Sequence, residues 1–172
     1  MRNILLIKPK IDFLNLIEYS YKKYSINNSF NLNIIENDDK KTLVKILDNS
    51  NDNSIFIIVG NNYFPVNKDF KFLKSNKDFF LFEDRNGLVE DFIVIRKTNF
   101  SINLIKELEF NSIEELISGL KYLSTKDKFF GDKIKTCLDV IMDFKFINKD
   151  VDFISFEKVN NKKIKFCIKS LI

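Results

Sequence analysis

Short apolar runs alternate with amphipathic stretches along the first sixty residues. The runs at 3–7 and 55–59 are continuously apolar, which is typical of strands buried on both faces. Two segments between these runs have apolar residues spaced as on one face of a helix. The segment between those two alternates apolar and polar residues, as a strand does. The predicted elements are strand 3–7, helix 11–24, strand 30–36, a helix that follows Asn37 or Asp38 and ends at 47, and strand 55–59. This β-α-β-α-β order favours a parallel sheet with crossover helices.

The second half of the chain predicts antiparallel strands and further helices. Asn86-Gly87 favours a tight hairpin turn, so the strands on its two sides should run antiparallel. A second antiparallel pair is expected around Asn160-Asn161. In chain order the predicted elements are helix 68–74, strands 78–82 and 88–95, helices 101–110, 112–123 and 132–142, and strands 151–156 and 163–168.

These elements predict a single α/β domain over residues 1–172. We expect a three-layer sandwich with a mainly parallel sheet and late antiparallel strands. A chain of 172 residues is long enough to bury one sizeable core. No internal repeat, low-complexity linker or domain boundary interrupts the pattern.

Composition narrows the chemistry that is available. The chain is 45% hydrophobic with 19 Phe, which supports a folded core. Ala, Gln, His and Trp are absent while Asn, Lys, Ile and Phe abound, as strongly AT-biased codons would supply. The net charge of +4 comes from interspersed charges, so nucleic acid is not an expected partner. Without His, no Ser-His-Asp or Cys-His set can form, and the commonest zinc ligand is missing.

The cysteines and the amino terminus suggest a cytoplasmic protein. Cys137 and Cys167 each lie in an apolar run, where an unpaired Cys is usually a small core residue. The apolar segment at the amino terminus is interrupted by Lys8 and Lys10, which is too early for a signal sequence. No run approaches the roughly 20 apolar residues that a membrane span needs, so no membrane partner is expected.

The segment 54–66, SIFIIVGNNYFPV, indicates where a ligand would bind. Its apolar strand leads directly into a loop that contains Gly60, Asn61 and Asn62. In open α/β sheets, ligands bind beyond the carboxyl ends of the strands, so these three residues are candidate ligand-binding residues. The two asparagines have an alternative role in a tight turn, because Asn tolerates the left-handed backbone conformation.

FIIVGNNYFPV also resembles a family motif. In the nucleotide-diphospho-sugar transferase-like proteins of the GT-A fold, which include sugar-phosphate nucleotidyltransferases, an apolar strand leads into a small residue, an acidic residue and a proline turn. The apolar strand and Gly60 match this form, Pro65 follows with a displacement of one or two residues, and the order of elements is similar over most of the chain. The resemblance implies a GT-A/Rossmann-like fold and a nucleotide or nucleotide sugar as ligand. It also implies nucleotidyl or glycosyl transfer, with Mg²⁺ stabilising the phosphate leaving group.

Two departures from the family pattern point to an inactive or repurposed relative, a pseudoenzyme. The glycine-rich activation loop is absent, because NILLIKPKIDF contains no glycine. The metal-binding Asp of the family would fall at Asn61 or Asn62, and an amide has no charge with which to hold Mg²⁺ against its hydration shell. Lys8 and Lys10, at the end of the first strand, would lie near phosphate.

A carboxylate from another loop could still hold Mg²⁺. Asp132 is the preferred metal candidate, ahead of Asp84 and Asp91, because it opens a predicted helix beside a glycine. Each of the three has an alternative role as a solvated surface residue or a helix cap.

The sequence therefore predicts a degenerate GT-A-like domain that acts as a binding or regulatory protein. The alternative is a non-catalytic receiver-like or flavodoxin-like domain in signalling or assembly, which would continue with parallel strands. A third hypothesis is a protein without a ligand, for which exposed Phe side chains would indicate a protein partner or a homo-oligomer. The direction of the strands around Asn86-Gly87 distinguishes the first hypothesis from the second.

Overall fold

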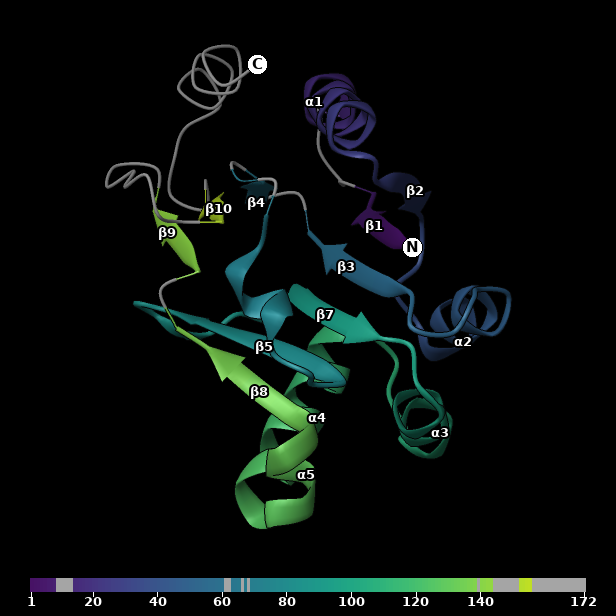
Figure 1. The fold of residues 1–172 in the computed structure, drawn as a ribbon, viewed down its shortest axis with the longest axis vertical. Coiled ribbons are helices and arrows are strands. Elements are labelled where there is room, and N and C mark those ends of the chain that lie inside the picture. The colour runs from purple at the N-terminus through teal and green to yellow at the C-terminus, as the bar shows by residue number, and fades with distance from the viewer. Residues whose placement is uncertain are drawn as a thin grey trace.

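A computed structural model shows a central sheet with helices on both faces and a small second sheet (Figure 1). The structure describes residues 1–8, 14–60, 63–65, 67, 69–138, 140–143 and 152–155. The helices are α1 (Leu14–Asn28), α2 (Lys40–Asp48), the 3-10 helix η1 (Lys71–Lys74), α3 (Asn99–Glu107), α4 (Ile113–Lys126) and α5 (Lys128–Lys133). The strands are β1 (Arg2–Ile7), β2 (Asn31–Ile35), β3 (Ile55–Val59), β4 (Tyr63–Pro65), β5 (Phe79–Asp84), β6 (Gly87–Leu88), β7 (Phe92–Arg96), β8 (Ile134–Cys137), β9 (Ile141–Asp143) and β10 (Phe153–Ser155).

The seven-stranded central sheet is mostly parallel. Its strand order is β2-β1-β3-β7-β5, and β6 and β8 also pair with β5. β1 runs parallel to β2 and β3, and β5 runs parallel to β8. β7 lies antiparallel between β3 and β5. A receiver-like or flavodoxin-like fold would continue the sheet with parallel strands, so that alternative is wrong.

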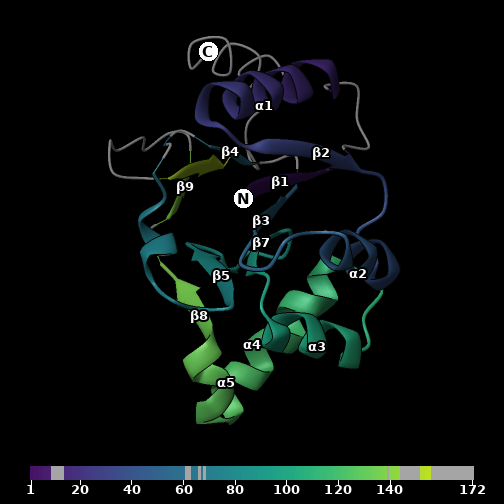
Figure 2. The same ribbon diagram turned by 45° about the vertical axis from the view of Figure 1, so that its right-hand side comes forward.

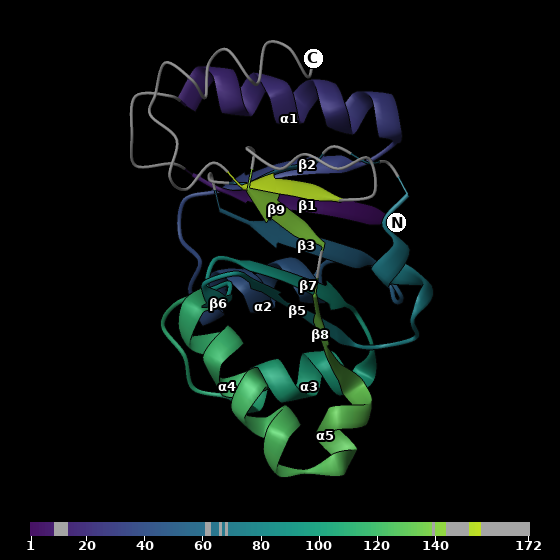
Figure 3. The same ribbon diagram turned by 90° about the vertical axis from the view of Figure 1, so that its left-hand side faces the viewer.

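The strands of the sheet centre are buried on both faces, as their continuous apolar runs predict. In β3, Ile57 and Val59 point into one core and Phe56 and Ile58 into the other, because side chains alternate along a strand. The first core also contains side chains of α1, η1 and the second sheet, including Tyr21, Phe70, Phe72 and Phe153. The second core is covered by α2, α3 and α4, which contribute Leu43, Leu47, Leu104, Ile105, Leu116 and Ile117 (Figures 2 and 3).

The caps and the hairpin follow local sequence. Thr42 N donates to the Asp39 side chain, 2.7 Å away, at the start of α2. Glu115 N donates to Ser112 Oγ, which caps the start of α4. The predicted hairpin is also confirmed: β5 and β6 pair antiparallel, and Gly87 takes the positive φ of 112° that its turn requires.

Among the described residues, no helix has the length and apolar character to cross a membrane.

Two predicted helices are wrong. The segment 132–142 was predicted to be helical, but α5 ends at Lys133 and β8 follows immediately. Ile134 and Cys137 are buried, and β8 satisfies the free edge of β5 by pairing with its residues 79–82. Tertiary pairing therefore overrides the helical spacing of the apolar residues. The described part of segment 68–74 forms only the short 3-10 helix η1.

The late antiparallel pair is found in part. β10 forms within the predicted strand 151–156, but it pairs antiparallel with β4 and parallel with β9. The predicted strand 163–168 lies outside the described residues. β4, β9 and β10 thus make the second sheet, and Phe153 of β10 stacks on Phe70 with ring centroids 5.0 Å apart.

Candidate functional site

The candidate site lies at the carboxyl edge of the central sheet, where β1, β2, β3 and β5 end. Because β7 runs antiparallel, it begins at this same edge, with Phe92 opposite Val59. One step further along, Gly60 N donates a 2.8 Å hydrogen bond to the backbone oxygen of Asp91. The register of β3 and β7 therefore brings an acidic residue beside the loop that the sequence singles out.

The glycine at position 60 is needed for this close approach. A Cβ built on Gly60 would lie 2.1 Å from Asp91 Oδ2 and 2.8 Å from its Cγ. These distances are far inside van der Waals contact, so any larger residue would displace the Asp91 side chain. The absence of a side chain at position 60 thus allows the Asp91 carboxylate to lie directly against β3.

A cavity of about 610 Å³ opens beside Asp91. Its described lining includes Tyr63 and five carboxylates, those of Asp38, Asp84, Glu90, Asp91 and Glu114, but no Lys or Arg. These groups come from the loop after β2, the β5–β7 hairpin, β4 and the start of α4. They accept hydrogen bonds from hydroxyl groups and attract cations, whereas a bare diphosphate would be repelled.

Asp38 links two walls of this cavity. Its Oδ2 accepts a hydrogen bond from Ile113 N, 3.1 Å away, in the first turn of α4. Backbone N–H groups at a helix start lack partners within the helix, and a carboxylate is favoured there. The loop after β2 is therefore fixed to the helix that closes the cavity.

Two tyrosines of α1 hold the chain on the far side of the loop. Tyr21 is fully buried, and its hydroxyl donates a 2.6 Å hydrogen bond to the backbone oxygen of Tyr63. The Tyr24 hydroxyl donates to the backbone oxygen of Asn67. Burial raises the pKa of Tyr21 well above its usual value, and the nearby charges of Tyr24 and Asp91 add to the shift. α1 therefore sets the position at which the chain leaves the Gly60 loop.

The predicted site residues are only partly brought together. Gly60 and Lys8 both lie at the carboxyl edge, following β3 and β1. Lys8 Nζ is 2.8 Å from Glu36 Oε1, and this contact raises the pKa of Lys8 and lowers that of Glu36. Lys10, Asn61 and Asn62 lie outside the described residues.

Asp132 lies away from Gly60. It is exposed on α5, just before the amino end of β8, and its backbone oxygen accepts a 2.6 Å hydrogen bond from Lys77 Nζ. β8 points in the same direction as β3, because β7 lies antiparallel between β3 and β5. Asp132 therefore belongs to the opposite edge of the sheet, and the structure gives it no place in the cavity beside Asp91.

Asp84 and Asp91, the carboxylates ranked behind Asp132, are the ones that line the cavity. The sequence signal that favours them is the hairpin at Asn86-Gly87, which returns the chain to the edge where β5 ends. Among the described residues, no group of three or more His, Cys, Asp or Glu side chains is arranged to hold a metal ion. Mg²⁺ commonly uses only one or two protein carboxylates together with phosphate oxygens, and Asp84 and Asp91 are two of the carboxylates that line the cavity.

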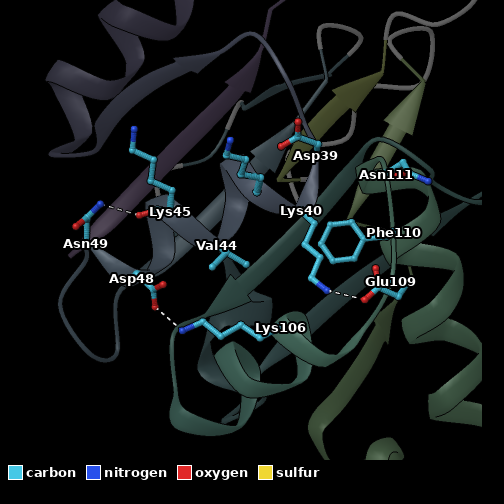
Figure 4. A pocket seen from close by; sticks show the side chains of 11 residues that line it. Asp39, Lys40, Val44, Lys45, Asp48, Asn49, Lys106, Glu109, Phe110 and Asn111 are labelled. Atoms are coloured by element: carbon cyan, nitrogen blue, oxygen red, sulfur yellow. Dashed lines mark hydrogen bonds and ion pairs between the residues drawn. The ribbon is translucent and has the colours of Figure 1, made fainter.

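A second, larger hollow of about 860 Å³ lies between α2 and the segment that follows α3 (Figure 4). Ion pairs cross it: Lys40 Nζ is 3.2 Å from Glu109 Oε1, and Lys106 Nζ is 2.8 Å from Asp48 Oδ1. These pairs join α2 to the α3 region and neutralise much of the lining charge. The groove lies on the helical face and not at the ends of the strands, so we assign the candidate site to the carboxyl-edge cavity.

Comparison with solved structures confirms the GT-A-like fold. The chain is similar to a glycosyltransferase involved in the glycosylation of the major capsid of PBCV-1, with a TM-score of 0.63 and 8% identity over 99% of this chain and 98% of that one. Its similarity to HddC from Yersinia pseudotuberculosis has a TM-score of 0.48 and 12% identity over 99% and 79% of the two chains. No family model matches the sequence, and no curated protein matches it.

Proposed function

We propose that the carboxyl-edge cavity binds a nucleotide sugar and that the chain acts by binding it, as a binding or regulatory protein. The observation that carries this proposal is the cavity itself. It lies beside Gly60 at the strand ends, where ligands of open α/β sheets bind. Its volume of about 610 Å³ falls within the usual range for small-molecule sites, roughly 300 to 1,000 Å³.

The lining chemistry supports a sugar together with a cation-neutralised diphosphate. Carboxylates accept hydrogen bonds from sugar hydroxyls. Asp38, Glu90 and Glu114 of the cavity lining could bind a sugar in this way. A diphosphate brings negative charge to a cavity that is already negative, so its binding should require a divalent cation. Asp91 and Asp84 are the residues that would hold Mg²⁺ or Mn²⁺, which would neutralise the diphosphate when bound.

Nucleotidyl transfer is not part of the proposal. The segment after β1 contains no glycine, so the backbone cradle for a triphosphate that the family resemblance implies is missing. The positions that match the metal-binding acid of the family are Asn61 and Asn62. Both departures support a protein that binds a nucleotide sugar without making one.

Metal-dependent glycosyl transfer is the second candidate function. One observation favours it: the Asp91 carboxylate lies against Gly60 and supplies an acid at the strand end where the loop itself has none. The fold is also similar to that of a solved glycosyltransferase, which supports this candidate. Transfer would need the same cation to stabilise the departing nucleoside diphosphate.

A thermal-shift screen tests binding directly. Uridine, guanosine, cytidine and thymidine diphosphate sugars would each be added with and without Mn²⁺ or Mg²⁺. A ligand at about 100 times its Kd stabilises the folded protein by about 2.7 kcal/mol, which raises Tm measurably. Because the acidic cavity repels a bare diphosphate, Tm should rise only when nucleotide sugar and cation are both present. Release of nucleoside diphosphate from the bound sugar would favour the transferase, binding without release would favour the binding protein, and the lack of any shift would contradict both.

A further inference from the structure

A second surface with a distinct chemistry lies at one end of the long axis, where α4 ends and α5 follows (Figures 1 and 3). We call residues 121–135, together with Phe100 of α3, the basal tip. A Cβ built on Gly131 of α5 would lie 3.2 Å from the backbone oxygen of Ser124 in α4, so the two helices pack closely here. The basal tip is therefore a fixed protrusion of the fold.

Aromatic side chains are exposed on the basal tip. Phe129 is 56% exposed and Tyr122 is 55% exposed. The ring of Phe129 is 5.6 Å from that of Phe100 and 5.5 Å from that of Phe130. Phe129 is thus the outward member of a three-ring cluster, and it is not an isolated surface residue.

Positive charge surrounds these rings. Residues 121–135 contain five Lys and two Asp, a net charge of 5 − 2 = +3. Lys121 Nζ lies 2.9 Å from Glu83 Oε1 and Lys133 Nζ lies 3.7 Å from Asp78 Oδ2, so Lys126, Lys128 and Lys135 supply the remaining positive charge. Lys126 Nζ lies 4.4 Å from the centre of the Tyr122 ring, and Lys133 Nζ lies 5.5 Å from that of Phe100. The carboxylate of Asp127 already accepts the hydrogen bond of Phe129 N at the start of α5.

We propose that the basal tip docks on an anionic lipid surface. Exposed aromatic rings can insert at the boundary between headgroups and acyl chains, and the lysines around them attract the negatively charged headgroups. Neither of the two described cavities is lined by residues of the tip, and its place at the end of the molecule suits a flat or yielding partner (Figure 1). Such a contact needs no membrane-spanning segment, so the sequence argument against a span does not apply to it.

The charge distribution gives this contact an orientation. α4 begins at the acidic cavity, where Ser112 and Glu114 contribute to the lining, and ends at Lys126 of the basal tip. Its 14 residues span about 21 Å at 1.5 Å per residue. An anionic surface attracts the basal tip and repels the cavity, so the docked protein should hold its cavity open to water, away from the lipid.

Vesicle flotation with the full chain tests the proposal. Vesicles of phosphatidylcholine alone would be compared with vesicles that contain about 30% phosphatidylserine, at low and high salt. Binding should appear with phosphatidylserine and be lost at about 0.5 M salt, where the Debye length falls to a few ångströms. Because each lysine near an anionic membrane contributes about fivefold in affinity, Lys126→Gln with Lys128→Gln should weaken binding about 25-fold.

Matched controls separate this contact from general basicity. Lys41→Gln with Lys45→Gln removes two exposed lysines from the first and last turns of α2 and should leave binding unchanged. Phe129→Ala should weaken binding about tenfold, whereas Tyr19→Ala, at a 58% exposed aromatic on α1, should not. The two double lysine variants should unfold at the same temperature as the parent chain. Phe129→Ala loses its ring contacts with Phe100 and Phe130, so its binding should be measured well below its own Tm.

Three results would overturn the proposal. They are an absence of binding to the anionic vesicles, an equal loss in the α2 control pair, and equally tight binding to soluble polyglutamate. The last result would identify an acidic chain as the ligand. None of these outcomes depends on whether the carboxyl-edge cavity binds a nucleotide sugar.

Discussion

Gly60 and Asp91 are joined by a 2.8 Å backbone hydrogen bond, and the Asp91 carboxylate occupies the space in which a side chain at position 60 would lie. The two residues are 31 positions apart in the sequence and come together because β7 returns antiparallel along β3. An acid is therefore present at the end of this strand, although the loop sequence Gly60-Asn61-Asn62 contains none.

Gly60→Ala should displace the Asp91 side chain. The added Cβ would meet Oδ2 at 2.1 Å, so the carboxylate must move, and we expect a loss of about 1 to 3 kcal/mol in the free energy of unfolding. Urea denaturation measures this change. Gly119→Ala is the matched control: its Cβ would meet nothing within 4 Å in α4, and helix propensity predicts a gain of about 0.5 to 1 kcal/mol. A loss of equal size in both variants would contradict the close contact.

Tyr21→Phe should destabilise the protein through a single buried hydrogen bond. The Tyr21 hydroxyl donates to the Tyr63 backbone oxygen, which would be left without this donor, at a cost of about 1 to 3 kcal/mol. Tyr19→Phe, at an exposed position of the same helix, should change the unfolding free energy by less than about 0.5 kcal/mol. Equal values for the two variants would show that the Tyr21 hydroxyl is not engaged as described.

Alkaline pH should destabilise the protein through the two buried tyrosines of α1, Tyr21 and Tyr24. Burial raises the pKa of both Tyr21 and Tyr24 above the usual value near 10. Above about pH 10 the unfolded chain loses these protons while the folded chain keeps them, so stability is complete below that pH and falls as pH rises. Unfolding free energy measured between pH 8 and about 11.5 should decline more steeply for the parent chain than for Tyr21→Phe.

Asp152→Asn should stabilise the protein at neutral pH. Burial raises the pKa of Asp152, a residue that is only 3% exposed and whose carboxylate accepts a hydrogen bond from Asn67 Nδ2. The unfolded chain then loses its proton at a lower pH than the folded protein, so this group costs stability as pH rises above about 4. The variant should have a higher Tm at pH 7 and a shrinking advantage toward pH 4. A lower Tm at pH 7 would contradict this sign.

The strands of the sheet centre could be predicted because a strand buried on both faces is a continuous apolar run in the sequence. The apolar run at 55–59 coincides with β3, and Asn86-Gly87 gave the antiparallel hairpin that identifies the fold. The segment 132–142 was mistaken for a helix, since its spacing fits a helical face and only the free edge of β5 makes it a strand. The spacing of apolar residues along a segment does not show which strand of the sheet still has an unpaired edge.

The carboxylate of the candidate site depends on register, which the sequence does not display. Asp132 was preferred for its position beside Gly131, a local feature that α5 places at the opposite edge of the sheet. Asp91 meets Gly60 only because Phe92 pairs with Val59. A shift of one residue would have pointed the side chain of Asp91 to the other face. Non-local pairing therefore decides the chemistry of this edge.

Isothermal titration of the tightest-binding nucleotide sugar into the parent chain, Asp91→Asn and Asp132→Asn, with and without Mn²⁺, tests the central claim most directly. We expect cation-dependent binding by the parent chain and by Asp132→Asn, and a loss of at least about tenfold in affinity for Asp91→Asn, which keeps the shape of the side chain but not its charge. Equal affinity of the parent chain and Asp91→Asn, or binding that Asp132→Asn abolishes, would contradict the assignment of the site to the carboxyl edge beside Gly60.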